Sequence, residues 1–108
     1  MVKRFVILCL GLIINIAVAA AADIENGKKL SSACSVCHGK DGISTYPEAP
    51  NLAGMSSIYF EKSLVDYRKG IRQDRRMTLI ASALSMEEIK DLAAWFSAFE
   101  VTVKLPEL

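Results

Sequence analysis

Five consecutive residues, Cys34 to His38, hold two cysteines and the only histidine of this 108-residue chain. Two thiols three residues apart with an imidazole directly after them form a compact set of metal or cofactor ligands. A chain of this length makes one small domain, and a domain of this size has a marginal core. A bound metal or cofactor would therefore help to stabilise the fold.

Three kinds of site use cysteine and histidine at this spacing. A structural zinc site needs four ligands, usually Cys or His, and this motif supplies three. A thioredoxin-like dithiol belongs beside a βαβ pattern, which the sequence lacks. The pattern C-x-x-C-H is the attachment signature of c-type haem. We therefore expect one covalent haem c, with thioether bonds to Cys34 and Cys37 and with His38 as an axial iron ligand.

A second axial ligand has to come from a residue other than histidine. The candidates are Met55, Met77 and Met86, and an open or lysine-ligated site is a further alternative. We favour Met77, because it follows a polar loop and a full predicted helix separates it from His38. Each methionine could instead fill the core. A His/Met-ligated iron has no free position for a substrate, so the pattern favours an electron carrier over an enzyme.

The first 22 residues have the layout of a secretory signal peptide. Lys3 and Arg4 precede an apolar run that ends in "AVAAAA", which offers A-x-A cleavage sites after Ala20 or Ala22. The alternative is a retained anchor, but the apolar core is short for a span of roughly 20 residues. We expect residues 1–22 to be removed, residues 23–108 to form the mature domain in the periplasm, and no stable membrane span to remain.

Apolar periodicity predicts an all-α fold of three or four helices. The expected helices cover residues 24–34 after an Asp23 cap, 56–70, 85–100, and a short segment at 77–84. Residues 39–54 read as a loop, because they contain glycines and prolines. In the second of these helices, the apolar residues near helical spacing are Ile58, Phe60, Leu64, Val65 and Tyr67.

The segment from Ser85 is the strongest helix signal. Ser85 and Glu88 form a capping-box pattern. An apolar stripe follows, with Trp95 at its flank. The stripe consists of Ile89, Leu92, Ala93, Phe96 and Phe99.

Five basic residues lie within "RKGIRQDRR", directly before Met77. We call this group the basic collar, and its members are Arg68, Lys69, Arg72, Arg75 and Arg76. It could steer an acidic redox partner toward the haem edge, remain a solvated loop, or supply an arginine to a haem propionate. The formal net charge is only +1 and no recognition motif is present, so nucleic acid is not an expected partner.

With these residues placed, the chain resembles a class I cytochrome c of the small bacterial periplasmic monohaem kind. The resemblance rests on "NGKKLSSACSVCHGKDG", "PNLAG", the Met77 segment and "LSMEEIKDLAAWFS", and it covers Ile24 to Phe99. It implies a cytochrome c fold wrapped around the haem. It also implies that Gly27 lies at a close crossing of the first and last helices, and that Trp95 packs there. Pro50 matches the position whose carbonyl accepts a hydrogen bond from the haem histidine, although it could be an ordinary loop proline.

Two features depart from the family pattern. Met55 stands where relatives often have a polar residue, and residues 100–108 extend past the usual end of the fold. Two functions remain open. One is a free carrier between redox proteins. The other is a fixed subunit that accepts electrons from a periplasmic dehydrogenase. An example is the cytochrome subunit of flavocytochrome c sulfide dehydrogenase, whose partner is a flavoprotein.

Overall fold

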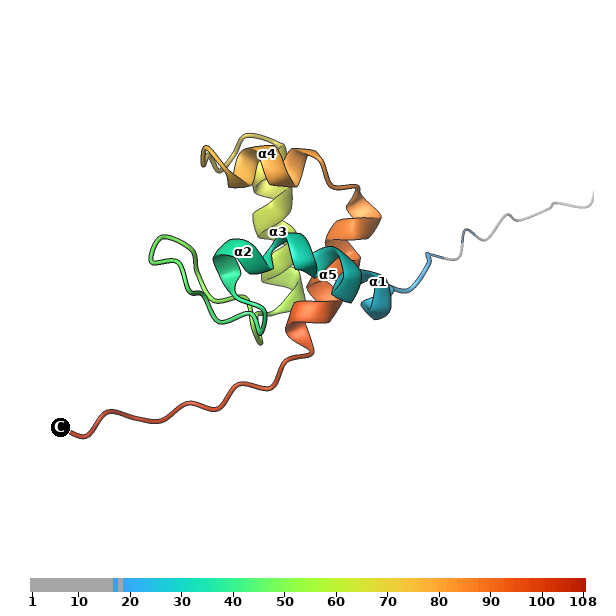
Figure 1. Ribbon diagram of the computed structural model, residues 1–108. Helices are drawn as coiled ribbons and strands as arrows, with labels where there is room; N and C mark the ends of the chain where they lie inside the picture. Colours follow the sequence, from blue (N-terminus) through green and yellow to red (C-terminus); the bar gives the residue numbers. More distant parts are fainter. Residues whose placement is uncertain (1–16, 18) are drawn as a thin grey trace, which may run out of the picture.

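The computed structural model describes residue 17 and residues 19–108. The fold is helical (Figure 1), and the described residues contain no β-strand. The predicted signal peptide falls largely on residues 1–16 and 18, which lie outside the described residues. No helix in the described part of the chain is long and apolar enough to cross a membrane. The expected all-α class is confirmed, with five α-helices in the described chain instead of three or four.

The first helical segment is divided into three pieces. Helix α1 covers Ile24–Leu30, a 3-10 turn covers Ser31–Ala33, and helix α2 covers Ser35–His38. Hydroxyls at Ser31, Ser32 and Ser35 donate to carbonyls three residues earlier, at 2.7, 3.0 and 2.7 Å. Such local bonds compete with regular helical pairing. The prediction of one helix over residues 24–34 was therefore wrong, and the C-x-x-C-H motif lies largely on a short helix of its own.

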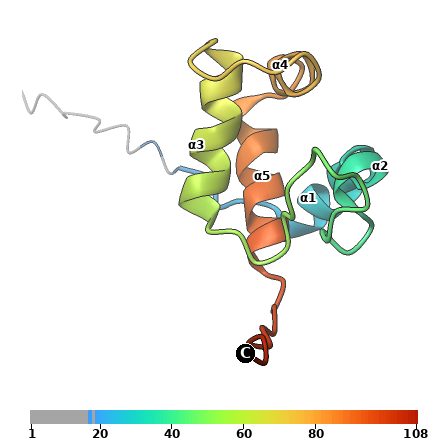
Figure 2. The same ribbon diagram turned by 90° about the vertical axis from the view of Figure 1, so that its left-hand side faces the viewer.

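Helices α3 (Ser57–Arg68) and α5 (Met86–Ser97) lie side by side and form the centre of the core (Figure 2). Phe60 of α3 stacks on Phe96 of α5 with ring centroids 5.5 Å apart. Ile58, one of the apolar residues near helical spacing, is 79% exposed and lies outside this core. The buried hydrophobic residues are Leu52, Phe60, Leu64, Ala81, Ile89, Leu92, Ala93 and Phe96.

The capping box at the start of α5 is present. The Glu88 amide donates to Ser85 Oγ at 3.1 Å, and the Ser85 amide donates to Glu88 Oε2 at 2.8 Å. Four members of the predicted stripe are buried, and Phe99 is half-buried. Because the cap holds the first turn and the stripe faces α3, α5 provides a rigid wall for the rest of the fold.

Helices α1 and α5 cross at Gly27. A Cβ atom at this position would lie 2.0 Å from the carbonyl oxygen of Asp91 and 3.0 Å from the Cβ of Trp95. Only glycine permits such close backbone approach. The crossing that the resemblance implied for Gly27 and Trp95 is confirmed. It anchors the N-terminal helix, and with it the C-x-x-C-H motif, to the core.

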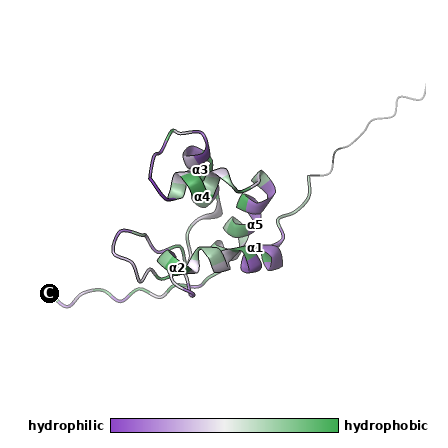
Figure 3. Cartoon of the chain, turned by 45° about the horizontal axis from the view of Figure 1, so that its top comes forward, coloured by the Kyte–Doolittle hydropathy of each residue, from purple (hydrophilic) through white to green (hydrophobic). Residues whose placement is uncertain are grey.

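A short helix, the loop before it and the C-terminal segment complete the fold. Helix α4 (Met77–Ser82) packs across the end of α3, as Figures 1 and 2 show. The loop between α3 and α4 is strongly hydrophilic, whereas parts of α3 and α4 are apolar (Figure 3). Residues 101–108 leave the fold as an exposed extended segment. The side of the molecule bounded by α2, α3 and α4 is therefore built from separate stretches of the chain.

Candidate functional site

The two thiols and the imidazole are presented by α2 and the turn before it. Cys34 and Cys37 are half-buried, and His38 is only 7% exposed. Burial raises the pKa of the Cys34 thiol. Gly39 ends the helix with φ of +80°, and a Cβ there would meet the Ile43 carbonyl oxygen at 1.9 Å. Glycine thus lets the chain turn sharply and fold back over the histidine.

His38 is held by the loop that follows it. Its Nδ1 atom lies 2.7 Å from the carbonyl oxygen of Pro50. A carbonyl oxygen can only accept, so the proton is on Nδ1 and the Nε2 lone pair is left for a ligand. The loop itself is fastened by Ser44, whose hydroxyl donates to the Cys37 carbonyl at 3.1 Å and whose amide donates to Asn51 Oδ1 at 2.7 Å. The imidazole therefore has a defined tautomer and orientation.

A cavity of about 370 Å³ lies against this motif, within the range of small-molecule sites. Cys34, Cys37 and His38 all line it, and apolar side chains from the loop, α3, α4 and α5 form most of its wall. Those apolar residues include Leu52, Phe60, Leu64, Ile80, Leu84 and Leu92. Two thiols, a buried imidazole with a ligand nitrogen and an apolar wall suit a haem, which needs covalent anchors, an axial nitrogen and a dry surrounding.

Two of the three candidate methionines line the same cavity. Met77 is the first residue of α4 and is half-buried. Its amide donates to Asp74 Oδ1 at 2.8 Å, which sets where α4 begins. Met55, on the loop before α3, also lines the cavity. Met86 lies at the start of α5, is 41% exposed and does not line the cavity. The geometry therefore leaves Met77 and Met55 as ligand candidates.

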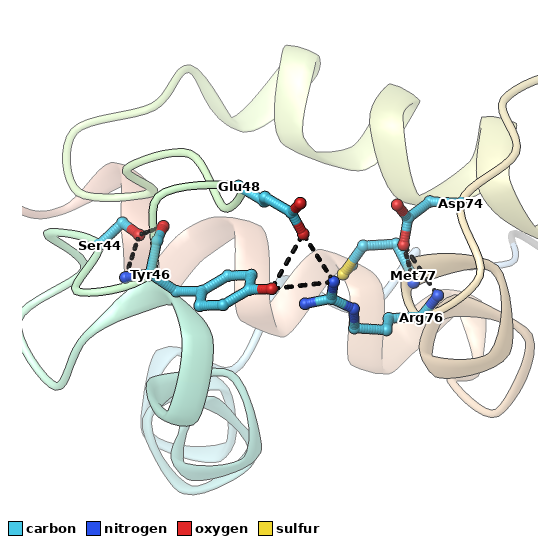
Figure 4. Close-up of polar contacts among 6 residues, drawn as sticks. All are labelled: Ser44, Tyr46, Glu48, Asp74, Arg76 and Met77. Atoms are coloured by element: carbon cyan, nitrogen blue, oxygen red, sulfur yellow. Dashed lines mark hydrogen bonds and ion pairs between the residues drawn. The ribbon is translucent and has the colours of Figure 1, made fainter.

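A polar bridge spans one side of the cavity. Arg76 Nη2 donates to Glu48 Oε2 at 2.8 Å and to the Tyr46 hydroxyl oxygen at 3.1 Å, while that hydroxyl donates to Glu48 at 2.9 Å. The guanidinium also lies over the Tyr46 ring, 4.8 Å from its centroid. Figure 4 shows Tyr46 and Glu48 reaching from their loop toward Arg76, beside Met77. We call this group the Tyr46–Glu48–Arg76 bridge.

The bridge shifts the pKa values of Glu48 and Arg76. Hydrogen bonds from Tyr46 and Arg76 lower the pKa of the Glu48 carboxyl, and the same contacts raise the pKa of Arg76. The backbone amides of Met77 and Arg76 lower the pKa of Asp74. The segment that carries Met77 is thus tied to the loop that carries Pro50.

The basic collar is not uniform in the structure. Arg68, Lys69, Arg72 and Arg75 are exposed, whereas Arg76 is half-buried in the bridge. Arg72 lies over the Tyr67 ring, 4.7 Å from its centroid, and lines the cavity as Arg76 does. The collar therefore borders the cavity through two arginines and extends into solvent through the other three residues.

Sequence reasoning did not identify Tyr46 and Glu48. Tyr46 lies 30 residues and Glu48 lies 28 residues before Arg76, in a segment read only as loop. A tyrosine and a glutamate two residues apart carry no periodic signal, so nothing local marked them. The negative charge of Glu48, opposite to that of the collar, was the one available clue.

Comparison with known proteins gives the family. A family model described as cytochrome c matches residues 24–98. Cytochrome c-554(548) of Halomonas halodenitrificans is 41% identical over 83 residues, which is 74% of this chain and 100% of that protein. The cytochrome subunit of sulfide dehydrogenase from Chlorobaculum tepidum is 37% identical over 72 residues, covering 67% of this chain and 64% of that one.

Solved structures agree with this result. The crystal structure of reduced recombinant cytochrome c4 from Pseudomonas stutzeri superposes with a TM-score of 0.70 at 35% identity, covering 77% of this chain. This chain spans 48% of that structure and 44% of the cytochrome c4 of Pseudomonas aeruginosa, so it corresponds to about half of a cytochrome c4. The chain belongs to the cytochrome c family, whose members carry covalently bound haem c and transfer electrons.

Proposed function

We propose that this chain is a periplasmic one-electron carrier with one haem c attached to Cys34 and Cys37 and an iron held by His38 and Met77. Haem c, when bound, supplies one-electron redox chemistry at its iron. The observation that carries the proposal is the buried His38 imidazole, whose Nδ1 proton is directed to the Pro50 carbonyl oxygen at 2.7 Å. The lone pair of Nε2 is thereby left for the iron, and both thiols line the same cavity.

The chain's residues would support electron transfer in three ways. His38 and a methionine would occupy both axial positions, so no position would remain for a substrate. The apolar wall would keep water from the cofactor, and a thioether ligand would raise the reduction potential. One electron would enter from a donor protein and leave to an acceptor protein, with no atom transferred.

The choice of Met77 over Met55 rests on chain geometry. Asp74 Oδ1 accepts from the amides of both Arg76 and Met77 at 2.8 Å, so Asp74 holds the backbone of Met77 and of the residue before it. The bridge ties the same segment to the loop behind His38. A preorganised ligand loses less entropy on binding than a free one. Met55 lies in a loop and has no comparable support from Asp74.

The processing of the chain is part of the proposal. Residues 1–22 would direct export and be removed, and residues 23–108 would form the mature haem domain. Residues 100–108 would form an extension that follows the domain. Export fits covalent haem attachment, because that step can take place outside the cytoplasm.

The test is a comparison of holoproteins with Met77→Ala and Met55→Ala substitutions. First, mass spectrometry after acid-acetone extraction should find one haem bound to each protein. Met77→Ala should then lower the reduction potential by a sizeable part of the roughly 0.8 V range that axial ligands span, while Met55→Ala should leave it near the wild-type value. Haem that is extracted by the solvent would exclude covalent attachment. The reverse result for the two variants would assign Met55 as the ligand.

A second candidate function is that of a fixed subunit of a periplasmic dehydrogenase with a flavoprotein partner. The exposed segment 101–108, with Val103 and Leu105 about 80% exposed, favours contact with another protein. The relative from Chlorobaculum tepidum is named as a cytochrome subunit of sulfide dehydrogenase. Size-exclusion chromatography of the native periplasmic extract separates the two functions, since a free carrier elutes at the size of one small domain.

A further inference from the structure

The carboxylate of Asp91 is buried where α5 crosses α1. Asp91 is only 8% exposed. Its Oδ1 accepts from the backbone amide of Asp23 at 2.7 Å, and its Oδ2 accepts from the Asn26 side-chain amide at 2.8 Å. Both donors come from the start of α1, and both are neutral in the uncut chain. Asp91 therefore ties the first residues of the helical domain to the last helix.

A buried carboxylate normally has a cationic partner, because removing a charge from water is costly. Asp66, the other buried carboxylate in the described residues, has such a partner in Lys62. Within residues 19–108 no lysine, arginine or histidine pairs with Asp91. Lys28 of α1 lies over the Trp95 ring instead. Among the described residues, no positive charge therefore pairs with this carboxylate.

Cleavage of the leader would supply that charge. Ala20, Ala21 and Ala22 precede Asp23, match the small-residue cleavage pattern and are all exposed. Hydrolysis of the Ala22–Asp23 peptide bond consumes one water. Ala22 keeps the new carboxylate, and Asp23 keeps the new amine, which takes up a proton at neutral pH. The nitrogen that receives the charge is the atom already 2.7 Å from Asp91 Oδ1.

We propose that the leader is cut between Ala22 and Asp23 and that the new N-terminal ammonium of Asp23 forms an ion pair with the buried carboxylate of Asp91. This rests on the proposed signal peptide but not on the haem ligands. A hydrogen bond between two charged groups is roughly twice as strong as one between neutral groups. The other charged group at this nitrogen is the carboxylate of Asp23 itself, which caps Asn26 at 3.0 Å and adds further negative charge. Processing would thus strengthen the α1–α5 crossing beside Gly27.

The first test is the intact mass of the holoprotein purified from the periplasm. The expected mass corresponds to residues 23–108 plus one haem. A mature chain that begins at Ala21, or anywhere else, would overturn the proposal. A chain that begins at Asp23 but lacks haem would contradict the proposed function and leave this inference standing, so the two failures are distinguishable.

The second test asks whether the charge stabilises the fold. Ala22→Gln removes the small residue before the cut, so cleavage should move upstream and leave the Asp23 nitrogen as a neutral amide. We expect this variant to melt about 5 °C or more below the wild type. In an Asp91→Asn background, Ala22→Gln should have no effect on the melting temperature. Asp66→Asn is the matched control, because its effect should be the same with either N-terminus.

The experiment remains informative even if Asp91→Asn fails to fold. The melting temperature of Ala22→Gln is then compared with those of the wild type and the Asp66→Asn control. Intact mass confirms where each variant begins. An Ala22→Gln protein that starts upstream of Asp23 and melts at the wild-type temperature would overturn the ion pair.

Discussion

Replacing Gly27 with alanine tests the helix crossing on which the haem motif depends. The added Cβ would lie 2.0 Å from the Asp91 carbonyl oxygen and 2.5 Å from its carbonyl carbon. Carbon and oxygen normally approach no closer than about 3.3 Å, so α1 and α5 would have to separate by about 1 Å. The obstacle is backbone, which cannot rotate away as a side chain would.

The expected cost follows from two opposing effects. Overpacking of a close contact costs roughly 1–3 kcal/mol, and a backbone obstacle belongs at the upper end of that range. Alanine recovers about 1 kcal/mol of helix propensity relative to glycine. The free energy of unfolding should therefore fall by about 2 kcal/mol. For a domain of this size that lowers the melting temperature by roughly 8–16 °C.

The assay is thermal unfolding of the holoprotein, followed by far-ultraviolet circular dichroism. Lys29→Ala is the matched control, because Lys29 lies on the same helix and is exposed. Its effect should stay within about 0.5 kcal/mol. A Gly27→Ala protein that melts at or above the wild-type temperature would refute the close backbone approach of α1 and α5.

Two further predictions concern the charged groups beside the cavity. If the exposed part of the basic collar steers an acidic redox partner, Arg72→Glu with Arg75→Glu should slow association by about tenfold or more and flatten its salt dependence. The same charge changes at Lys29 and Lys90 are the control, and equal salt slopes in stopped-flow measurements would show that the collar is only solvated. Glu48→Gln should lower stability at neutral pH, because hydrogen bonds hold the pKa of Glu48 below its usual value. The stabilisation by the Glu48 charge is present above about pH 4.3 and is lost as the pH falls through the lowered pKa. The free energies of unfolding of the variant and the wild type, measured in urea, should therefore converge in acid. A difference that persists in acid would contradict the role of the charge.

Local sequence patterns were enough for the parts of this protein that depend on near neighbours. The C-x-x-C-H motif needs only five residues, and all of its ligating groups lie within two helical turns. The capping box needs Ser85 and Glu88 alone, and the α5 stripe needs only helical periodicity. These features were predicted because their geometry follows from spacing along one element.

Predictions were weaker where the burial of a residue depends on which surfaces of the helices pack together. Ile58 belongs to the apolar residues near helical spacing in α3, yet it is largely exposed. The serines after α1 interrupt the helix through local bonds that periodicity does not register. Periodicity reports what a side chain could bury, and only packing decides what it does bury.

The tertiary structure alone brought distant residues together. Arg76 meets Glu48 across 28 residues, and the Asp23 amide meets Asp91 across 68. Met55 and Met77 also line one cavity, although each follows a different loop. Such contacts arise because α3 and α5 bury a shared apolar face and draw their connecting loops to the same side. The free energy of that burial resides in the whole core, so no short stretch of sequence records which loop residues it will bring together.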